Sequence, residues 1–230
     1  MKRTFCGIAG MLLCFAAQSS VVMTGSRVVY PAGTKEVSVQ LTNNDAWPAA
    51  VQVWLDDGDV NSTPQTAKAP FFTTPPLFRL APKAGQTVRL RFTGQATPTD
   101  RESLWWLNFM QIPPVQESEK QANQLLVMMR NRVKVFYRPV GLTGSPQEMA
   151  KTTRIGLRKG QLWLRNDSGY YLSLSRLVVS GGGKTQEIVG KTIAPWSTQA
   201  WPATVSVLNH ATMSWLNDQG ASLNGTPERE

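Results

Sequence analysis

The sequence predicts an all-β protein that is built from two consecutive β-sandwich domains. Short segments alternate apolar and polar residues with a period of two, as half-buried antiparallel strands do. Stretches rich in Pro, Gly, Asn and Asp separate these segments and supply the turns. A connector, residues 139–146, follows about one sandwich of predicted strands and precedes a second series.

The first series begins with residues 37–41, where VSVQL alternates apolar and polar side chains. Residues 51–55 and 88–92 repeat this alternation, and the stretches TNNDAWP, DDGD, TTPP and PKAGQ are typical of turns. Residues 115–123 have the composition of a helix, but they lack an apolar stripe. We therefore interpret them as a polar loop.

The second series of strands reads LWLRN, YYLSLSRLVVS, TQEIVGKTI, TQAWPATVSVL and MSWLND in chain order. SGGGK, residues 180–184, predicts a hairpin loop between two of these strands. The expected domains are residues 20–141 and 142–230, which are joined by the short connector.

The N-terminal sequence MKRTFCGIAGMLLCFAAQSS has the features of a secretory signal peptide. Lys2 and Arg3 give it a basic start, and residues 5–17 form an apolar core too short to span a membrane. Small residues follow, so the expected signal peptide is residues 1–19. Both cysteines lie within it, which leaves the mature chain without a disulfide. Loss of the two basic residues lowers the net charge from +9 to +7.

Several classes of function find no support in the sequence. We find no polybasic run, zinc-ligand spacing or RNA-binding aromatic motif, so nucleic acid is not an expected partner. No later segment is long and apolar enough to predict direct membrane insertion. The single histidine, His210, has neither a mature cysteine for a zinc site nor a serine–acid setting, so we interpret it as a surface or capping residue.

The stretch DDGDVN, residues 56–61, places carboxylates at the spacing of a calcium loop. Ser62 and Lys68 occupy the positions where such a loop needs Gly and a bidentate Glu, so we interpret the stretch as a solvated turn. The eight tryptophans fit a sandwich core at least as well as a carbohydrate site. A pair of catalytic carboxylates from distant strands stays open as an alternative. The sequence nevertheless predicts no enzyme, metal or cofactor.

Two cations lie within apolar strand sequences: Arg27 in GSRVVYP and Lys134 in NRVKVFY. Burying an unpaired cation costs several kcal/mol, on the order of the effective penalty for a buried ion. One interpretation is that both side chains reach the surface along their own methylene groups. The other is that they share a cleft and bind an anion, for which a carboxylate is well suited.

The stretch NQLLVMMRNRVKVFYRPV, residues 123–140, changes character along its length. Residues 125–129 are apolar at every position, whereas basic and apolar residues alternate after them. The apolar half is either a central strand covered on both faces or a strand that offers one face to a partner. In a regular strand Lys134 faces away from Leu125, Val127 and Met129, and twist or a bulge near Asn131 would reconcile them.

The chain resembles the periplasmic chaperones of the chaperone–usher pilus pathway. The matching segments span nearly the whole mature chain in the order of the family: SRVVYPAG, LTNND, TPPLFRL, TDRESLWWLNFMQIPP, NRVKVFYRP and LNDQGA. The resemblance implies two immunoglobulin-like domains in a boomerang arrangement.

The resemblance also implies the site residues. Arg27 and Lys134 correspond to the pair that binds the C-terminal carboxylate of a subunit. Leu125, Val127 and Met129 correspond to the donor strand, which completes the unfinished sandwich of a pilin. A trio that orients the two domains corresponds to Glu102, Arg138 and Asp218.

The function implied by this resemblance is that of a periplasmic chaperone that binds, folds and caps pilin-type subunits by donor-strand complementation. It would deliver them to an outer-membrane usher for fimbria assembly. Whether the free protein also caps its own strand by self-association is left open by the sequence. The short loop VQESEKQAN is similar to the branch associated with rod-like pili. From the residues alone, a secreted structural subunit or adhesin and a carbohydrate-binding module remain alternatives.

Overall fold

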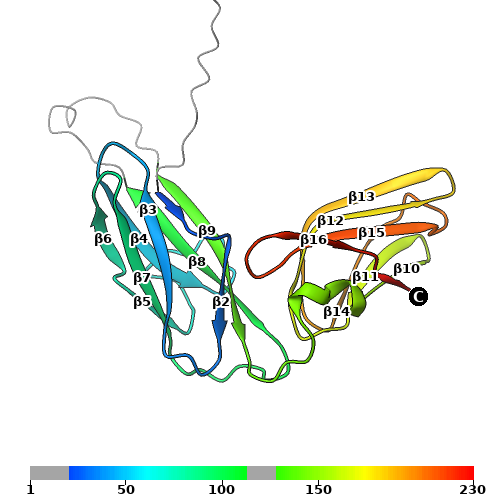
Figure 1. Cartoon of the computed structure of the whole chain (residues 1–230), viewed down its shortest axis with the longest axis horizontal. Helices are drawn as coiled ribbons and strands as arrows, with labels where there is room; N and C mark the ends of the chain where they lie inside the picture. The colour runs from blue at the N-terminus through cyan, green and yellow to red at the C-terminus, as the bar shows by residue number, and fades with distance from the viewer. Residues whose placement is uncertain (1–20, 113–127) are drawn as a thin grey trace, which may run out of the picture.

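The computed structural model describes residues 21–112 and 128–230. These residues form two immunoglobulin-like β-sandwiches that meet at an angle, which gives the molecule the outline of a boomerang (Figure 1). The predicted all-β, two-domain fold is therefore confirmed. Within the described ranges, no helix is long and apolar enough to cross a membrane. The predicted signal peptide, residues 1–19, lies outside them.

The first domain packs a four-stranded sheet against a five-stranded sheet. The first sheet has the order β1-β3-β7-β5: β1 (Val21–Met23), β3 (Val37–Asn43), β7 (Gly85–Phe92) and β5 (Phe71–Thr74). The second has the order β2-β9-β8-β4-β6: β2 (Arg27–Pro31), β9 (Met129–Arg138), β8 (Ser103–Ile112), β4 (Ala49–Asp56) and β6 (Leu77–Leu80).

The alternation seen in the sequence places one set of side chains between these two sheets. Each strand turns every second residue inward, so the apolar positions form one continuous core. Its buried members include Val39, Leu41, Val88, Leu90, Val51, Val53, Leu107 and Val135. Burial at about 25 cal/mol per Å² makes this core the main source of the domain's stability.

Strand β9 has a regular register but is flanked on both sides over only part of its length. It pairs antiparallel with β8 from Met129 to Tyr137 without a register shift. On its other side β2 runs parallel and begins only where Arg27 pairs with Lys134. Among the described residues, the segment 129–133 therefore has one unpaired edge. No bulge occurs near Asn131, so Met129 and Lys134 lie on opposite faces of the strand.

The second domain, which follows the connector, consists of two sheets with four strands each. A 3₁₀ segment, η2 (Pro146–Thr152), leads into it. One sheet has the order β14-β11-β10-β17: β14 (Ser197–Pro202), β11 (Gln161–Asn166), β10 (Thr153–Arg158) and β17 (Glu228–Arg229). The other has the order β13-β12-β15-β16: β13 (Lys184–Ile193), β12 (Leu172–Gly181), β15 (His210–Leu216) and β16 (Ser222–Gly225).

A buried asparagine closes the end of a strand in each domain. The Asn43 side-chain amide donates to the carbonyl of Trp47 over 2.8 Å, and that of Asn166 donates to the carbonyl of Tyr170 over 2.7 Å. Both amides also reach carbonyls of a third segment, Ala81 in the first domain and Ala194 in the second. The two domains therefore use the same polar device to satisfy backbone groups in a loop that folds onto the core.

Candidate functional site

Arg27 and Lys134 are neighbours at the boundary between the two domains. They are directly paired residues of the adjacent parallel strands β2 and β9. Arg27 donates from Nη1 to the carbonyl oxygen of Leu216 over 3.2 Å, and Lys134 donates from Nζ to Oγ1 of Thr192. Because Leu216 and Thr192 belong to the second domain, both cations lie where the domains meet. The two cations are thus adjacent in the structure, and that they bind an anion stays a prediction.

The electrostatics of this pair favour an anion. Burial lowers the pKa of Arg27, although the charge of Asp218 acts in the opposite direction. Burial together with the charge of Arg27 lowers the pKa of Lys134. The buried Nε of Arg27 has no hydrogen-bond partner among the described residues. Within the described part of the chain, no carboxylate lies within 4.0 Å of either cation. An added carboxylate would therefore relieve the repulsion and accept from the free N–H group.

The predicted trio of charges forms one network that links the domains. Arg138, at the end of β9, donates from Nε to Oε1 of Glu102 over 2.7 Å. Its two terminal nitrogens donate to the two oxygens of Asp218, each over 2.8 Å. Oε2 of Glu102 accepts a 2.8 Å bond from the backbone N–H of Tyr171. Glu102 and Arg138 belong to the first domain, and Asp218 and Tyr171 belong to the second.

Burial sets the energetics of this network. Glu102 is 3% exposed, and burial raises its pKa above the ordinary value although Arg138 acts in the opposite direction. Burial acts to lower the pKa of Arg138, but the hydrogen bonds and charges of Asp218 and Glu102 outweigh it and raise the pKa. Arg138 is therefore the group that makes the buried Glu102 carboxylate tolerable.

Only one of the three predicted donor residues lies within the described part of the chain. Met129 is 51% exposed at the start of β9, and Leu125 and Val127 lie outside the described residues. Met129 shares its face of β9 with Val133 and Val135, which pack in the core of the first domain. Met129 thus lies beyond the core, in the part of β9 where β8 but not β2 is its neighbour among the described residues.

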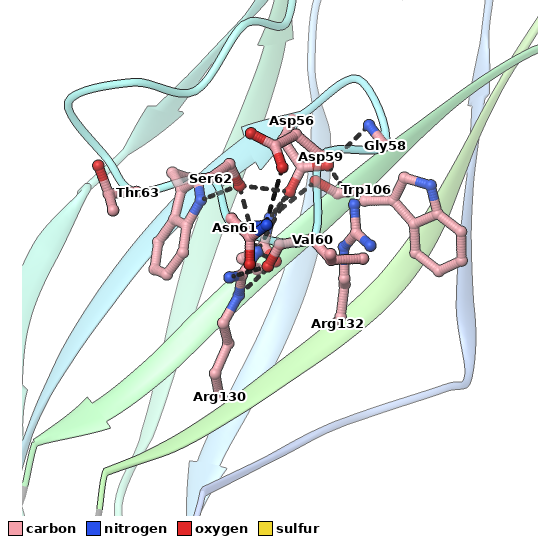
Figure 2. A network of polar contacts seen from close by, with 12 residues as sticks. Asp56, Gly58, Asp59, Val60, Asn61, Ser62, Thr63, Trp106, Arg130 and Arg132 are labelled. Carbon is pink, nitrogen blue, oxygen red and sulfur yellow. Dashed lines mark hydrogen bonds and ion pairs between the residues drawn. The ribbon is translucent and has the colours of Figure 1, made fainter.

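A buried polar cluster on the opposite face of β9 was not predicted from the sequence (Figure 2). Asp56 ends β4 and is 0% exposed, which corrects our interpretation of it as part of a solvated turn. Its carboxylate accepts from Ser62 Oγ over 2.8 Å, from Asn108 Nδ2 over 2.7 Å and from the Gly58 backbone N–H over 2.8 Å. Arg132 also donates to it. The residues that follow, 57–61, are exposed as expected of a turn.

Arg130 completes this cluster. It donates from Nε and Nη2 to Oδ1 of Asn108 over 2.9 and 2.7 Å, and from Nη2 to Asp56 over 3.4 Å. The guanidinium groups of Arg130 and Arg132 lie 4.9 and 4.5 Å from the ring centres of Trp54 and Trp106. The only sequence signal for this cluster is the pair of arginines at alternate positions of one strand.

The described residues hold no group of three or more His, Cys, Asp or Glu that could bind a metal ion. His210 is exposed at the start of β15. Among the described residues, the polar groups that bear on the candidate site are the cation pair, the interdomain trio and the Asp56 cluster.

Comparison with protein families matches both domains of the chain. The model of the pili and flagellar-assembly chaperone, PapD N-terminal domain, matches residues 20–143. The model of the pili assembly chaperone PapD, C-terminal domain, matches residues 148–226. The chaperone protein MrkB of Klebsiella pneumoniae is 36% identical over 97% of this chain and 97% of its own length. The probable fimbrial chaperone YadV of Escherichia coli is 36% identical over 96% of this chain and 94% of its own.

Solved structures give the same result. The crystal structure of the YadV chaperone superposes with a TM-score of 0.76 at 34% identity, covering 90% of this chain and 98% of that one. The complex of the Salmonella enterica SafA pilin with the SafB chaperone gives a TM-score of 0.73 at 26% identity, covering 90% and 96%. With both domain models and full-length relatives in agreement, the chain belongs to the family of pili assembly chaperones.

Proposed function

We propose that this protein is a non-enzymatic periplasmic chaperone that binds, folds and caps pilin-type subunits and delivers them to an outer-membrane usher. Its relative SafB has been solved in complex with the SafA pilin, which supports a pilin as the partner. The predicted signal peptide supports export of the chain. Three features of the first domain would hold such a subunit: the unpaired edge of β9, its apolar row and the cation pair.

The observation that carries the proposal is the unpaired edge of β9. Residues 129–133 pair only with β8 among the described residues, and β2 occupies the other side from Lys134 onward. A strand with free N–H and C=O groups accepts another strand as a neighbour. A guest strand laid along this edge, in line with β2, would reach Arg27 and Lys134 at its end.

The position of the cations sets the direction of the guest. If the C-terminal carboxylate of the guest binds Arg27 and Lys134, its strand points toward the start of β2. The guest then runs in the direction of β2, which is parallel to β9. The carboxylate would accept from the free Nε of Arg27 and offset the mutual repulsion of the two cations.

The apolar row on β9 supplies the second half of the interaction. Met129 is half exposed and lies on the same face of β9 as Val133 and Val135, with the polar Asn131 between them. Val135 is part of the first core, and Val133 packs against it. Leu125 and Val127 precede Met129 at alternate positions of the sequence and lie outside the described residues. A subunit that lacks a strand would cover the row with its own groove, because alternate side chains of an added strand enter one face.

The interdomain network has a positioning role in this proposal. Arg138 joins Glu102 and Asp218, and it lies four residues after Lys134 on β9. By fixing the second domain, the network holds Leu216 and Thr192 against the two cations. The anchor site then keeps one geometry in the free protein, which reduces the entropy lost on binding.

The anchor is tested by co-expressing the chaperone and its cognate subunit, identified as the protein that co-purifies from periplasm in a one-to-one ratio. Arg27→Ala and Lys134→Ala should each reduce recovery of the subunit by about tenfold, since hydrogen bonds to charged groups contribute about 1.5–3 kcal/mol. The matched control is Arg176→Ala, which removes an exposed cation of the second domain. Wild-type recovery with either anchor variant would reject the assignment of the carboxylate site.

The donor strand is tested by Met129→Asp in the same assay. The side chain is half exposed, so the free variant should fold with the Tm of the wild type while it captures less subunit. The charge would have to enter the apolar groove of the guest, where it is not paired. General unfolding of the variant would instead show that Met129 is needed for the protein's own core.

A further inference from the structure

A row of four cations lies along one face of β9. Arg130, Arg132, Lys134 and Arg138 occupy even-numbered positions of a strand whose register against β8 is unbroken as far as Tyr137. Alternate residues of a strand are about 6.6–6.8 Å apart, so each neighbour in this row is a competing site for a carboxylate. A guest chain that carries one terminal carboxylate therefore meets several cations along its path.

Carboxylates of the protein occupy three of these four cations. Asp56 pairs with both Arg130 and Arg132, and Glu102 and Asp218 pair with Arg138. Among the described residues, Lys134 is the only member of the row without a carboxylate partner; it contacts Thr192 and lies 5.8 Å from the ring centre of Trp106. The buried Nε of Arg132 also has no hydrogen-bond partner among the described residues, but the guanidinium charge is paired with Asp56 through Nη2. Lys134 is thus the one cation of this row whose charge no described carboxylate offsets.

Hydrogen bonds keep the Asp56 carboxylate ionised and hold it in place. Burial acts to raise its pKa, but hydrogen bonds from Ser62, Arg132 and Asn108 outweigh it and hold the pKa below the ordinary value. Its side chain is fully buried. The guanidinium groups of Arg130 and Arg132 lie over the rings of Trp54 and Trp106, and Figure 2 shows Arg132 between Asp56 and Trp106. A fixed carboxylate at this place does not exchange readily with one brought by a guest.

The pairing also draws the two arginines away from the unpaired edge. The partners of Arg130 and Arg132 lie on β4, on β8 and in the loop after β4, at Asp56, Asn108 and Val60. In the sheet order β2-β9-β8-β4, these elements lie on the side of β9 opposite to β2. The path of a guest strand beside residues 129–133 therefore stays clear of both guanidinium groups.

We propose that Asp56 selects the register of the guest strand by occupying Arg132, so that Arg27 and Lys134 form the single available anchor. This inference rests on the proposed carboxylate site and names a residue that determines its specificity. Side-chain packing alone discriminates weakly here. A slip of one residue reverses the faces of the guest strand, but a slip of two residues keeps them. Arg132 lies two residues from Lys134, so an unpaired Arg132 would offer the register that packing tolerates best.

The experiment reads the register directly by disulfide cross-linking. The chaperone carries Asn131→Cys on the segment with the unpaired edge, and the expected mature chain has no other cysteine. The probe is the subunit that co-purifies with the wild-type chaperone, in cysteine-free variants with one cysteine at successive positions counted from its C-terminus. The chaperone with an intact Asp56 should form one dominant product.

Asp56→Asn should shift part of the guest toward Arg132. In a parallel guest strand this brings a residue two positions nearer to the C-terminus opposite residue 131, and the corresponding product should increase about tenfold or more over that of the chaperone with Asp56. Asp56→Asn/Arg132→Met should return the pattern to a single product, because the second anchor is gone. Ser62→Ala is the control: it removes the hydroxyl that donates to Asp56 and accepts from Trp54 and Arg130, but it leaves the charge of Asp56, and the pattern should not change.

An unchanged pattern in Asp56→Asn would overturn the proposal, and so would a shifted product that persists after Arg132→Met is added. If Asp56→Asn does not fold, Lys134→Ala tests the same point with Asp56 intact. Arg132 should then remain occupied and give no shifted product, whereas a shifted product would show that Asp56 does not mask it. Failure of the proposed function is distinct, because the chaperone with Asp56 and Lys134 would then capture no subunit.

Discussion

Replacing Arg138 by methionine should destabilise the protein strongly and in a way that depends on pH. The methionine keeps much of the length of the side chain but removes the guanidinium that joins both domains. Glu102, whose side chain is 2% exposed, would keep one backbone N–H donor from Tyr171 and lose the one cation that pairs with it among the described residues. Asp218 would lose its bidentate hydrogen bonds from Arg138, but its carboxylate is partly exposed to water.

The magnitude follows from the charge that is left behind. Removing one partner of a buried ion pair typically costs about 3–5 kcal/mol, because the remaining charge is uncompensated. We expect this loss in the free energy of unfolding at pH 7. The exposed pair of Arg176 and Glu187 provides the matched control, and Arg176→Met should cost about 0–1 kcal/mol.

The dependence on pH has a defined sign. Burial already raises the pKa of Glu102 in the folded protein above its ordinary value of 4.5, and the loss of Arg138 raises it further. At pH values between 4.5 and the raised pKa of Glu102 in the folded variant, the folded variant binds a proton that the unfolded chain has released. Its stability therefore falls as the pH rises through this window. The difference from the wild type should be smallest near pH 4.5 and largest at neutral pH.

Urea unfolding of both variants, followed by tryptophan fluorescence at a series of pH values between 4.5 and 7.5, measures this effect, and small-angle scattering reports the angle between the domains. A cost below about 1 kcal/mol at pH 7, equal to that of Arg176→Met, would refute the reasoning. The same conclusion would be drawn from a cost that does not vary with pH.

Three further outcomes are expected from the structure. Because the pKa of Lys134 lies below its ordinary 10.5, binding of a subunit should weaken as the pH rises toward 10.5, and calorimetric titration in Lys134→Arg should show no such loss. Asn166→Ala leaves the carbonyls of Tyr170 and Ala194 without their donor and should cost about 1–3 kcal/mol in urea unfolding. Gly156→Ala places a Cβ 2.4 Å from the Trp163 ring and should cost about 1–3 kcal/mol, whereas an unchanged Tm would show that the ring moves freely.

The sequence alone was sufficient for the architecture because alternation is a local property. In segments such as residues 37–41 and 88–92, the alternation of apolar and polar residues predicts which face of the strand is buried. This prediction does not depend on which strand is the neighbour. The resemblance carried by short motifs added the positions of Arg27, Lys134 and the interdomain trio. The structure places these residues where the two domains meet.

The tertiary structure decided which polar groups are partners. Asp56 reads as the start of a solvated turn, yet it is buried against Arg132, which is 76 residues away in the chain. The buried amides of Asn43 and Asn166 likewise have no signal in the composition of their loops. Pairing over such distances depends on the order of strands in a sheet, which a local pattern does not encode.

The unpaired edge of β9 is the clearest case of this division. From the residues alone, 125–129 fitted either a covered central strand or a strand that serves a partner. The register of β2 resolves only the described part, because it leaves 129–133 with β8 as the one neighbour. An apolar sequence indicates that its side chains are buried from water. The arrangement of the surrounding strands determines whether the same chain or another protein buries them.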